Sequence, residues 1–395
     1  MKLNTKAVHV GDRKPQGPNV AVPVTTPIYT ASSYAYESLE TTDKVFAGEV
    51  DGYAYARYDN PTNHALDELC AALENGHGAL TCGSGMSALE MAIKTALIDR
   101  RKKVVAANAL YGATINLLLK VLEPFGVETT FVDICDTEKV AAAIAEEQPG
   151  AVLMETVSNP LLRVGAIDKI ADLTRQANAA LIVDNTFATP ALVRPLELGA
   201  NMVVHSLTKY LAGHGDVMGG LIVSDEQHFN ALRTLSKTYG PILGPFEAYL
   251  TMRGIKTFPL RMERQCANAI AVAKFLRAHP HVDRVYFTDD PAHPDASTIA
   301  RLFPEGQYGA MISFDLKGAG RDEVFAFMNR LRLVVKATSL GDVHTMMLYP
   351  PISSHRDLSP KQRERMGIKD SLVRLSVGIE AVEDICADLD QALKG

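Results

Sequence analysis

Short apolar runs alternate with amphipathic segments through the middle of the chain. Runs rich in β-branched residues, such as GAVLMETVSNP (150–160) and AALIVDNTF (179–187), predict buried strands. Segments such as DTEKVAAAIAEEQ (136–148) and AIDKIADLTRQAN (166–178), with apolar residues at helical spacing, separate them. Strands that alternate with helices favour an α/β fold with a mostly parallel sheet that is covered on both faces.

The pattern changes near both ends of this region. Residues 1–60 are rich in Pro, Thr, Tyr and Gly and only weakly periodic, which predicts an extended arm that lies on another surface, such as a second subunit. Residues 61–255 are predicted to form the large domain. Residues 256–395 begin with long helical patterns and continue with strand patterns such as GAMISFDL and LVRLSVGIE, which predict a smaller C-terminal α/β domain.

Composition narrows the function classes. The chain has 395 residues, 47% of them hydrophobic, and a formal net charge of -6, so it can bury a large core and has no basic stripe for nucleic acid. Its five cysteines are an odd number without a C-x-x-C pair, which argues against a disulfide framework or a zinc site and favours a reducing cytoplasm. The N-terminus has no secretory signal pattern, and no apolar run approaches the ~20 residues that span a bilayer. We therefore expect no metal, no membrane and no nucleic-acid partner.

The segment HSLTKYLAGHGDVMGG (205–220) holds the first candidate for chemistry, Lys209. An isolated lysine after a strand is ordinarily a solvated surface group. Here Ser206 and Thr208 could donate to phosphate, and the glycines behind the lysine would let a flat ring approach. An enzyme that uses pyridoxal phosphate needs a lysine for a Schiff base and an acid for the ring nitrogen. Asp184, at the end of an apolar run, could supply that acid, although alone it would be an ordinary strand-end aspartate.

Other candidates follow predicted strands or occupy the arm. TCGSGMSALE, with Gly85 and Met86, resembles a phosphate-binding turn at a helix N-terminus, although many such turns only join a strand to a helix. Tyr111 could stack on a ring, and Arg374 could bind a carboxylate through its guanidinium fork. In the arm, Tyr55 and Arg57 are two residues apart and would face the same way in an extended strand. A core tyrosine or a surface salt bridge is the ordinary alternative for each of these residue types.

The order of these motifs resembles the transsulfuration family of pyridoxal-phosphate enzymes over about residues 5–393. The family includes cystathionine γ-synthase, cystathionine γ-lyase, methionine γ-lyase and O-acetylhomoserine sulfhydrylase. The motifs, in chain order, are YARYDNPT, SGMSA, LYGAT, ETVSNP, VDNTFATP, HSLTKYLAGHGDVMGG, RGIKT, TSLGD and RLSVG. The resemblance implies the type I fold of these enzymes, which is similar to that of aspartate aminotransferase, and the cofactor pyridoxal 5'-phosphate.

The resemblance also implies roles for individual residues. Lys209 would bind the cofactor covalently and move protons, Asp184 would pair with the ring nitrogen, and Tyr111 would stack on the ring and help to protonate the leaving group. The remaining cofactor ligands would be Asn159 at the ring 3-oxygen, and Gly85, Met86, Ser206 and Thr208 at the phosphate. Tyr55 and Arg57 would bind the phosphate of the neighbouring subunit. Arg374, with Ser339, Asn159 and Thr338 nearby, would hold the substrate.

Departures from the subfamilies bear on the reaction. Members that act on cystathionine usually carry a glutamate where this chain has Thr338, and methionine γ-lyases carry a cysteine where it has Ala113. The segment YPPISSHRDLSP (349–360), with Arg356, also differs from the usual form. We predict a γ-elimination lyase that acts on a γ-substituted L-amino acid such as methionine and gives 2-oxobutanoate and ammonia.

Alternatives remain at this point. The first alternative is a γ-replacement enzyme, either a cystathionine γ-synthase or an O-acetylhomoserine sulfhydrylase. The next alternative is a cystathionine γ-lyase or a canavanine γ-lyase. A protein that keeps the fold without catalysis, for regulation or for binding a sulfur carrier, is the alternative from another class, but it has no chemical need for Lys209, Asp184, Tyr111 and Arg374 together. The resemblance also implies a homotetramer, built as a dimer of dimers with shared active sites.

Overall fold

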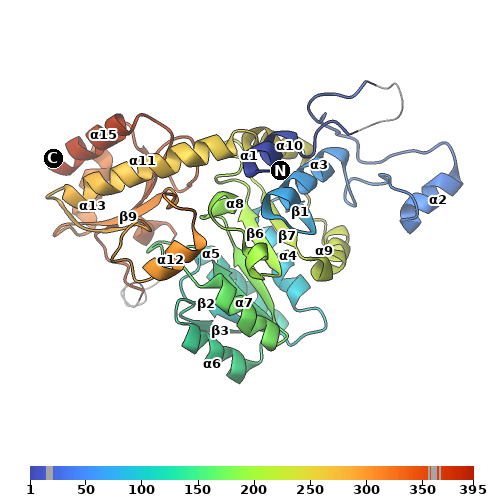
Figure 1. Ribbon diagram of the computed structural model, residues 1–395, viewed down its shortest axis with the longest axis horizontal. Helices are drawn as coiled ribbons and strands as arrows, with labels where there is room; N and C mark the ends of the chain where they lie inside the picture. The colour runs from blue at the N-terminus through green and yellow to red at the C-terminus, as the bar shows by residue number, and fades with distance from the viewer. Residues whose placement is uncertain (15–20, 355, 357–362, 364–365) are drawn as a thin grey trace.

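Two β-sheets, each with its own helices, organise the chain (Figure 1). The computed structural model describes residues 1–14, 21–354, 356, 363 and 366–395. In Figure 1 the first sheet and its helices occupy the centre and the lower part, and the second sheet lies at the left with the C-terminus. The long helix α11 (Phe258–Ala278) runs from the first part toward the second.

The first sheet has seven strands in the order β1-β7-β6-β5-β4-β2-β3. Strand β7 is antiparallel to both of its neighbours, and the other neighbouring pairs are parallel. The prediction of a mostly parallel sheet is therefore confirmed. The strands are β1 (Gly78–Cys82), β2 (Lys103–Ala107), β3 (Glu128–Val132), β4 (Ala151–Glu155), β5 (Ala180–Asp184), β6 (Met202–Ser206) and β7 (Gly220–Ser224).

Helices cover this sheet, and local signals explain where they begin. Helix α3 starts at Pro61, which lacks an N–H, and the Asn60 side chain accepts a hydrogen bond from the amide of Thr62 at 2.9 Å. The helices of this part are α3 (Pro61–Glu74), α4 (Gly85–Ala96), α5 (Gly112–Asn116), the π-helix η1 (Leu117–Leu122), the 3-10 turn η2 (Glu123–Phe125), α6 (Thr137–Glu147), α7 (Ile167–Gln176), α8 (Thr189–Leu192), the 3-10 turn η3 (Pro195–Leu198), α9 (Glu226–Tyr239) and α10 (Pro245–Ile255).

The second sheet has five strands in the order β10-β11-β12-β9-β8. Its central strand carries Arg374 and is antiparallel to both neighbours. Its strands are β8 (Val282–Tyr286), β9 (Met311–Leu316), β10 (Val335–Lys336), β11 (Met346–Leu348) and β12 (Leu372–Ser376), and the further helices are α12 (Ala296–Leu302), α13 (Arg321–Arg330), the 3-10 turn η4 (Pro350–Ile352) and α15 (Val382–Lys394). The strand patterns of the C-terminal region are confirmed.

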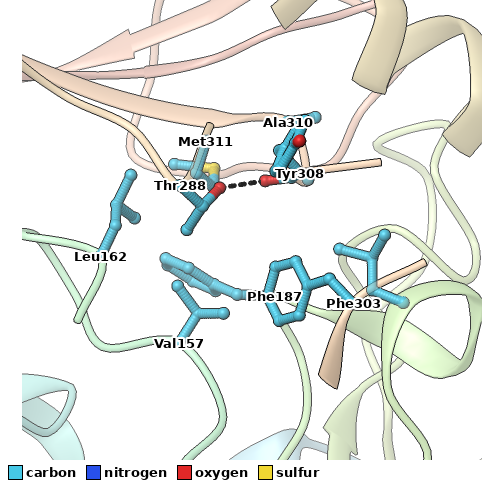
Figure 2. Close-up of a pocket in the computed structure, with 10 residues that line it drawn as sticks. Val157, Leu162, Phe187, Thr288, Phe303, Tyr308, Ala310 and Met311 are labelled. Atoms are coloured by element: carbon cyan, nitrogen blue, oxygen red, sulfur yellow. Dashed lines mark hydrogen bonds between the residues drawn. The ribbon is translucent and has the colours of Figure 1, made fainter. Parts of the chain in front are cut away.

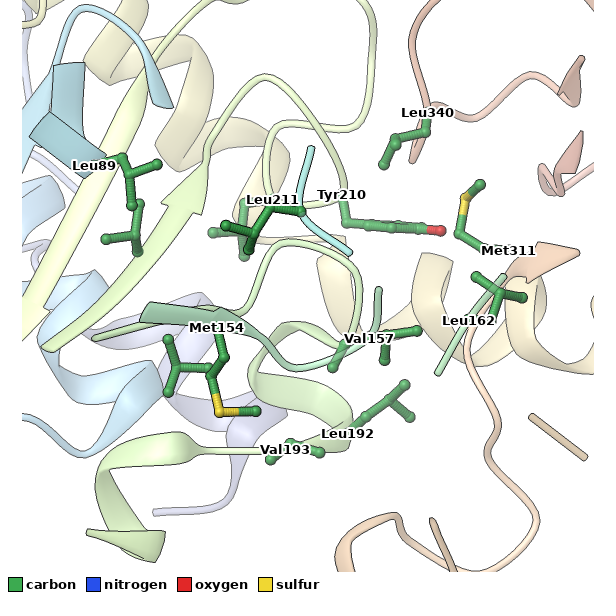
Figure 3. Packing of buried hydrophobic residues seen from close by; sticks show 14 of the residues in the cluster. Leu89, Met154, Val157, Leu162, Leu192, Val193, Tyr210, Leu211, Met311 and Leu340 are labelled. Carbon is green, nitrogen blue, oxygen red and sulfur yellow. The ribbon is translucent and has the colours of Figure 1, made fainter. Parts of the chain in front are cut away.

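The two parts share a continuous hydrophobic core. Tyr210, from the turn after β6, extends toward Met311 and Leu340 of the second part (Figure 3). Phe187 lines a small cavity together with Tyr308, which comes from the second part (Figure 2). The cavity volume is about 10 Å³, close to the minimum for one water molecule, so it is too small for a cofactor or an amino acid. Tight packing across this seam fixes the relative position of the two sheets.

The N-terminal 60 residues are not extended throughout. Helix α1 (Leu3–His9) packs against α3 and α11, whereas α2 (Leu39–Ala47) projects away from the body of the molecule at the right of Figure 1. We call residues 21–60 the projecting arm. Several of its large apolar side chains are exposed: Val22, Val24, Leu39, Phe46, Val50 and Tyr55. A cluster of exposed apolar groups of this kind is typical of a surface that another protein covers.

Two further features of the described residues bear on the class of protein. Among them there is no helix that combines the length and the apolar character needed to cross a membrane. The same residues contain no group of three or more His, Cys, Asp and Glu side chains arranged to hold a metal ion.

Candidate active site

The carboxyl ends of three adjacent parallel strands bring the central candidates together. Glu155, Asp184 and Ser206 are the last residues of β4, β5 and β6, and Lys209 follows β6 after a short turn. The register pairs Glu155 with Asp184 on neighbouring strands. Because ligands in open α/β sheets bind at the carboxyl ends of the strands, this edge is the expected location of a site.

The surroundings of the Lys209 side chain favour the neutral form of its amine. Its Nζ donates a hydrogen bond to Ser339 Oγ at 3.0 Å, across 130 residues of sequence. Burial, and then the positive charge of Arg374, lower the pKa of Lys209 to about 8. A lysine with a lowered pKa is a better nucleophile near neutral pH, as covalent attachment of an aldehyde requires.

Asp184 presents one carboxylate oxygen that its neighbours do not use. Its Oδ1 accepts hydrogen bonds from the amide of Thr186 at 3.0 Å and from the hydroxyl of Thr186 at 2.6 Å. Burial raises the pKa of Asp184, while the two bonds from Thr186 and the nearby His205 act in the opposite direction. In the described part of the chain no group donates to Oδ2, so this oxygen suits a protonated ring nitrogen.

The N-terminus of α4 has the features of a phosphate site. Ser84 Oγ accepts from the amide of Ser87 at 3.1 Å, and the Ser84 carbonyl accepts from the amide of Ala88 at 3.0 Å. Among the described residues no acceptor is bonded to the amides of Gly85 and Met86, the first two of the helix. Free amides at a helix N-terminus, with the helix dipole behind them, stabilise an anion.

Close packing places the Lys209 turn beside these amides. A β-carbon at Gly85 would lie 3.1 Å from Ser206 Cβ, and one at Gly220 would collide with the Ser84 carbonyl. Thr208 Oγ1 accepts a hydrogen bond from the amide of Gly219 at 3.1 Å, which fixes the turn that contains Lys209. Ser206 and the start of α4 therefore face one another, as a shared phosphate site requires.

Arg374 is a buried cation, and the neighbouring residues do not provide hydrogen-bond acceptors for all of its N–H groups. Its Nη1 donates to Asn159 Oδ1 at 2.9 Å, and its guanidinium carbon lies 5.8 Å from the centre of the Phe187 ring. Its Nε is buried without a hydrogen-bond partner among the described residues, and burial lowers the pKa of Arg374 to about 10. Because an unpaired buried donor is costly, this position suits a carboxylate ligand.

Tyr111 stands at the N-cap of α5 with its side chain 43% exposed. Its backbone amide donates to Glu155 Oε1 at 2.6 Å, and its hydroxyl is close enough to interact electrostatically with Arg374. The side chain is therefore available for contact with a ligand instead of being part of the core.

Glu155 is a member of this cluster that sequence analysis missed. It ends an apolar strand beside the one that Asp184 ends. That shared position, an acid at the last residue of a buried strand, is the signal that could have identified it.

Tyr55, Arg57 and Thr338 are not brought into the cluster. Residues 55–58 form a hydrogen-bonded turn, in which the amide of Tyr58 donates to the carbonyl of Tyr55, so they are not extended as expected. Arg57 Nη1 donates to the Lys237 carbonyl, and its guanidinium lies 4.8 Å from the centre of the Tyr58 ring. Thr338 is exposed and directly precedes Ser339, the partner of Lys209. Most of the segment after Ser354 that sequence analysis singled out lies outside the described residues, although Arg356 is described.

The arrangement fits pyridoxal phosphate at three points. Lys209 suits an aldehyde carbon, and the unused oxygen of Asp184 suits a ring nitrogen. The free amides at the start of α4 suit a phosphate. Arg374 lies near enough to act on Lys209 electrostatically, so a substrate carboxylate could bind beside the attached ring.

Comparison with known proteins agrees with this chemistry. The chain is 41% identical over 395 residues to an L-methionine gamma-lyase of Fusobacterium nucleatum subsp. polymorphum, covering 99% of this chain and 98% of the relative. It is 38% identical over 394 residues to an O-succinylhomoserine sulfhydrylase of Pseudomonas aeruginosa, covering 99% and 95%.

A crystal structure of cystathionine gamma synthase from Xanthomonas oryzae pv. oryzae matches the fold with a TM-score of 0.91 and 34% identity, covering 100% of this chain and 98% of the other. The family model for the Cys/Met metabolism PLP-dependent enzymes matches residues 4–394. The chain therefore belongs to the Cys/Met metabolism family of pyridoxal-phosphate-dependent enzymes.

Proposed function

We propose that this protein is a γ-elimination lyase that converts a γ-substituted L-amino acid, such as methionine, and water into 2-oxobutanoate, ammonia and the released γ-substituent, which is a thiol when methionine is the substrate. The observation that carries the proposal is the position of Arg374, a buried cation with an unpaired Nε, near the Lys209 amine. One group can hold the carboxylate of an amino acid while the other acts at its α-carbon. The similarity to L-methionine gamma-lyases supports this choice of substrate class.

The residues that would hold the cofactor are those at the strand ends. Lys209 would bind its aldehyde carbon, Asp184 its ring nitrogen and Asn159 its 3-oxygen, and the phosphate would be held by the amides of Gly85 and Met86 with the hydroxyls of Ser206 and Thr208. When bound, pyridoxal phosphate supplies an electron-withdrawing ring that stabilises the negative charge left by removal of a proton from the substrate carbon.

The remaining steps belong to side chains of this chain. Arg374 orients the substrate through its carboxylate, with Ser339 and Asn159 beside it. Lys209 Nζ would accept the α-proton of the substrate, and its pKa of about 8 suits a base that works near neutral pH. Tyr111, exposed at the start of α5, would stack against the ring and supply a proton to the leaving group from its hydroxyl.

Thr338 favours elimination from a substrate without a distal ammonium group. Its neutral hydroxyl is exposed next to Ser339 and can offer only a neutral hydrogen bond. Charge-assisted hydrogen bonds are roughly twice as strong as neutral ones, so cystathionine gains little here. The second candidate is γ-replacement, because a sulfhydrylase and a synthase are both similar to this chain.

Turnover without an added thiol separates the two candidates. We expect the purified enzyme to release 2-oxobutanoate and ammonia from methionine when no thiol acceptor is present. The measurement is a substrate panel of methionine, cystathionine, homocysteine, O-acetylhomoserine, O-succinylhomoserine, cysteine and canavanine, with identification of keto acid and ammonia. Product that forms only after a thiol is added would identify a γ-replacement enzyme instead.

A single substitution provides the matched test of substrate choice within the same panel. Thr338→Glu should raise the kcat/KM for cystathionine relative to that for methionine, because a carboxylate would pair with the distal ammonium group. The control is Thr338→Gln, because glutamine is similar in size to glutamate but carries no charge. An equal effect of both substitutions would assign the change to side-chain size and would remove charge from the explanation.

We also propose that the active site is shared between subunits of a dimer and that two such dimers form a tetramer. The support is the projecting arm, whose apolar side chains are exposed on this chain and whose Tyr55 and Arg57 lie outside the cluster around Lys209. We further propose residues 61–255 and 256–395 as the two domains. The five cysteines are free, which favours a cytoplasmic location.

Mixed dimers test the shared site directly. Co-expression of Arg57→Ala chains with Lys209→Ala chains should restore activity, because one of the two sites in a mixed dimer then has both an intact arginine and an intact lysine. Each variant expressed alone should be much less active than the mixture. Mixed dimers confirmed by mass spectrometry that show no recovered activity would contradict sharing.

A further inference from the structure

Glu155 is a buried carboxyl group at the centre of the site to which no role has yet been assigned. It is the last residue of β4, is 8% exposed, and stands next to Asp184 in the register of the sheet. Carboxyl groups are rarely buried without a reason, because removing their charge from water is costly.

The contacts of Glu155 connect two segments that carry active-site residues. Its Oε1 accepts the backbone amide of Tyr111 at 2.6 Å, at the start of α5. The backbone amide of Asn159, in the loop that follows β4, also lies close enough to this carboxyl group to stabilise its charge. Asn159 in turn accepts a hydrogen bond from Arg374 at 2.9 Å. One carboxyl group thus links the ring-stacking tyrosine to the residues expected at the substrate carboxylate.

The surroundings of Glu155 determine which carboxyl group carries the charge. The charged groups that act on it are Asp184 on β5 and Arg374 on β12. Burial, and then the charge of Asp184, raise the pKa of Glu155, whereas the two backbone amides and Arg374 act in the opposite direction. Asp184 has two hydrogen bonds from Thr186 that stabilise its anion. Two buried carboxyl groups side by side do not both ionise easily, so Glu155 is the member that keeps its proton at neutral pH.

We propose that Glu155 is a positioning residue, a neutral carboxylic acid that fixes Tyr111 and Asn159 through their backbone amides and leaves the negative charge of the pair on Asp184. The inference rests on the proposed function only for the roles of Tyr111 and Asn159. The geometry itself belongs to the protein without cofactor and can be tested there.

The first test uses the protein without cofactor and does not depend on activity. Glu155→Ala should speed the hydrogen exchange of the Tyr111 amide about 10-fold or more, because this amide loses its acceptor, and should also speed that of the nearby Asn159 amide. Glu155→Gln keeps an acceptor oxygen and should leave both rates near those of the wild type. Glu74→Gln is the matched control, since Glu74 is buried in the same part of the molecule but bonds to His205.

An infrared spectrum tests the protonation state of Glu155 independently. The difference spectrum between the wild type and Glu155→Gln at pH 7 should contain the carbonyl band of a buried protonated carboxyl group, and the difference spectrum for Glu74→Gln should not. Burial also raises the pKa of Asp67, so a band from Asp67 cancels in both differences. If the difference spectrum for Glu155→Gln lacks this band, or if Tyr111 and Asn159 exchange at wild-type rates in Glu155→Ala, the proposal is overturned.

The second test follows the effect into catalysis. Glu155→Ala should lower kcat by about 100-fold, as misplacement of a catalytic group by about 1 Å can do, with a smaller change in KM. Glu155→Gln should recover most of this loss. In a Tyr111→Phe background the additional loss from Glu155→Ala should shrink, because residues that act through one another are not additive.

The outcomes separate this inference from the proposed function. A glutamine variant no more active than the alanine variant, or fully additive losses with Tyr111→Phe, would overturn the positioning role. A wild-type enzyme that forms product only with an added thiol would overturn γ-elimination and leave the amide-exchange result intact.

Discussion

Lys209→Ala should leave a folded protein that cannot hold pyridoxal phosphate covalently and has no measurable turnover. Lys209 is the amine at the carboxyl ends of β5 and β6, and burial lowers its pKa to about 8, so it is prepared for attack on an aldehyde. The absorption band of the lysine-bound cofactor should disappear. Borohydride, which makes the wild-type bond permanent, should no longer attach the cofactor to the variant.

Two further variants make this test specific. Lys209→Arg keeps the positive charge beside Ser339 but cannot form the covalent bond, so it should be as inactive as Lys209→Ala. Lys120→Ala, at an exposed position, should behave as the wild type. Peptide mapping of the borohydride-reduced wild type gives the decisive observation. Reduced cofactor on any lysine other than Lys209 would show that the assignment is wrong.

Arg374→Ala should raise the KM for the amino-acid substrate strongly while the cofactor absorption stays intact. Arg374 is 3% exposed, and its Nε has no hydrogen-bond partner in the described residues, so a substrate carboxylate would complete its hydrogen bonding. Loss of one partner of a buried charged pair costs on the order of 2–5 kcal/mol, which is roughly 30- to 5,000-fold in affinity. Steady-state kinetics and an absorption spectrum measure the two effects separately.

A conservative substitution at position 374 shows what the planar guanidinium group contributes to substrate binding. Arg374→Lys keeps a charge but cannot form two parallel bonds to a carboxylate, so its KM should lie between those of the wild type and Arg374→Ala. Arg301→Ala, which removes a surface pair with Asp168, is the control and should change the KM little. Unchanged KM and unchanged kcat in Arg374→Ala would remove this arginine from the substrate site.

Local patterns in the sequence were sufficient to predict most of the large sheet and part of the site. Strands β4 and β5 are short, buried and rich in β-branched or long apolar residues, so their positions follow from local preference and burial. Asp184 is the last residue of β5, and Lys209 lies three residues after the end of β6, the next parallel strand. Parallel neighbours necessarily bring their carboxyl ends to the same edge.

Local patterns failed where periodicity was weak. Helix α2 lies in a segment that was expected to be extended, yet Ser38 caps it by accepting a hydrogen bond from Thr41, and Gly48 ends it in the left-handed conformation. These signals were present in the sequence, but the helix buries none of its own residues within this chain. Its apolar side chains have no core within this chain to pack on, and the surrounding segment did not show the sustained periodicity that marks a helix on a core.

The sequence by itself determined most of the elements, the family and the chemical identity of the groups, because each of these is set by residue type and local spacing. Only the tertiary structure decided which groups meet. Arg374 reaches Asn159 across 215 residues because β12 is central in the second sheet and faces the loop after β4. Glu155 becomes the neighbour of Asp184 only because β4 lies beside β5, and strand order depends on long-range hydrogen bonding and packing, which no local pattern specifies.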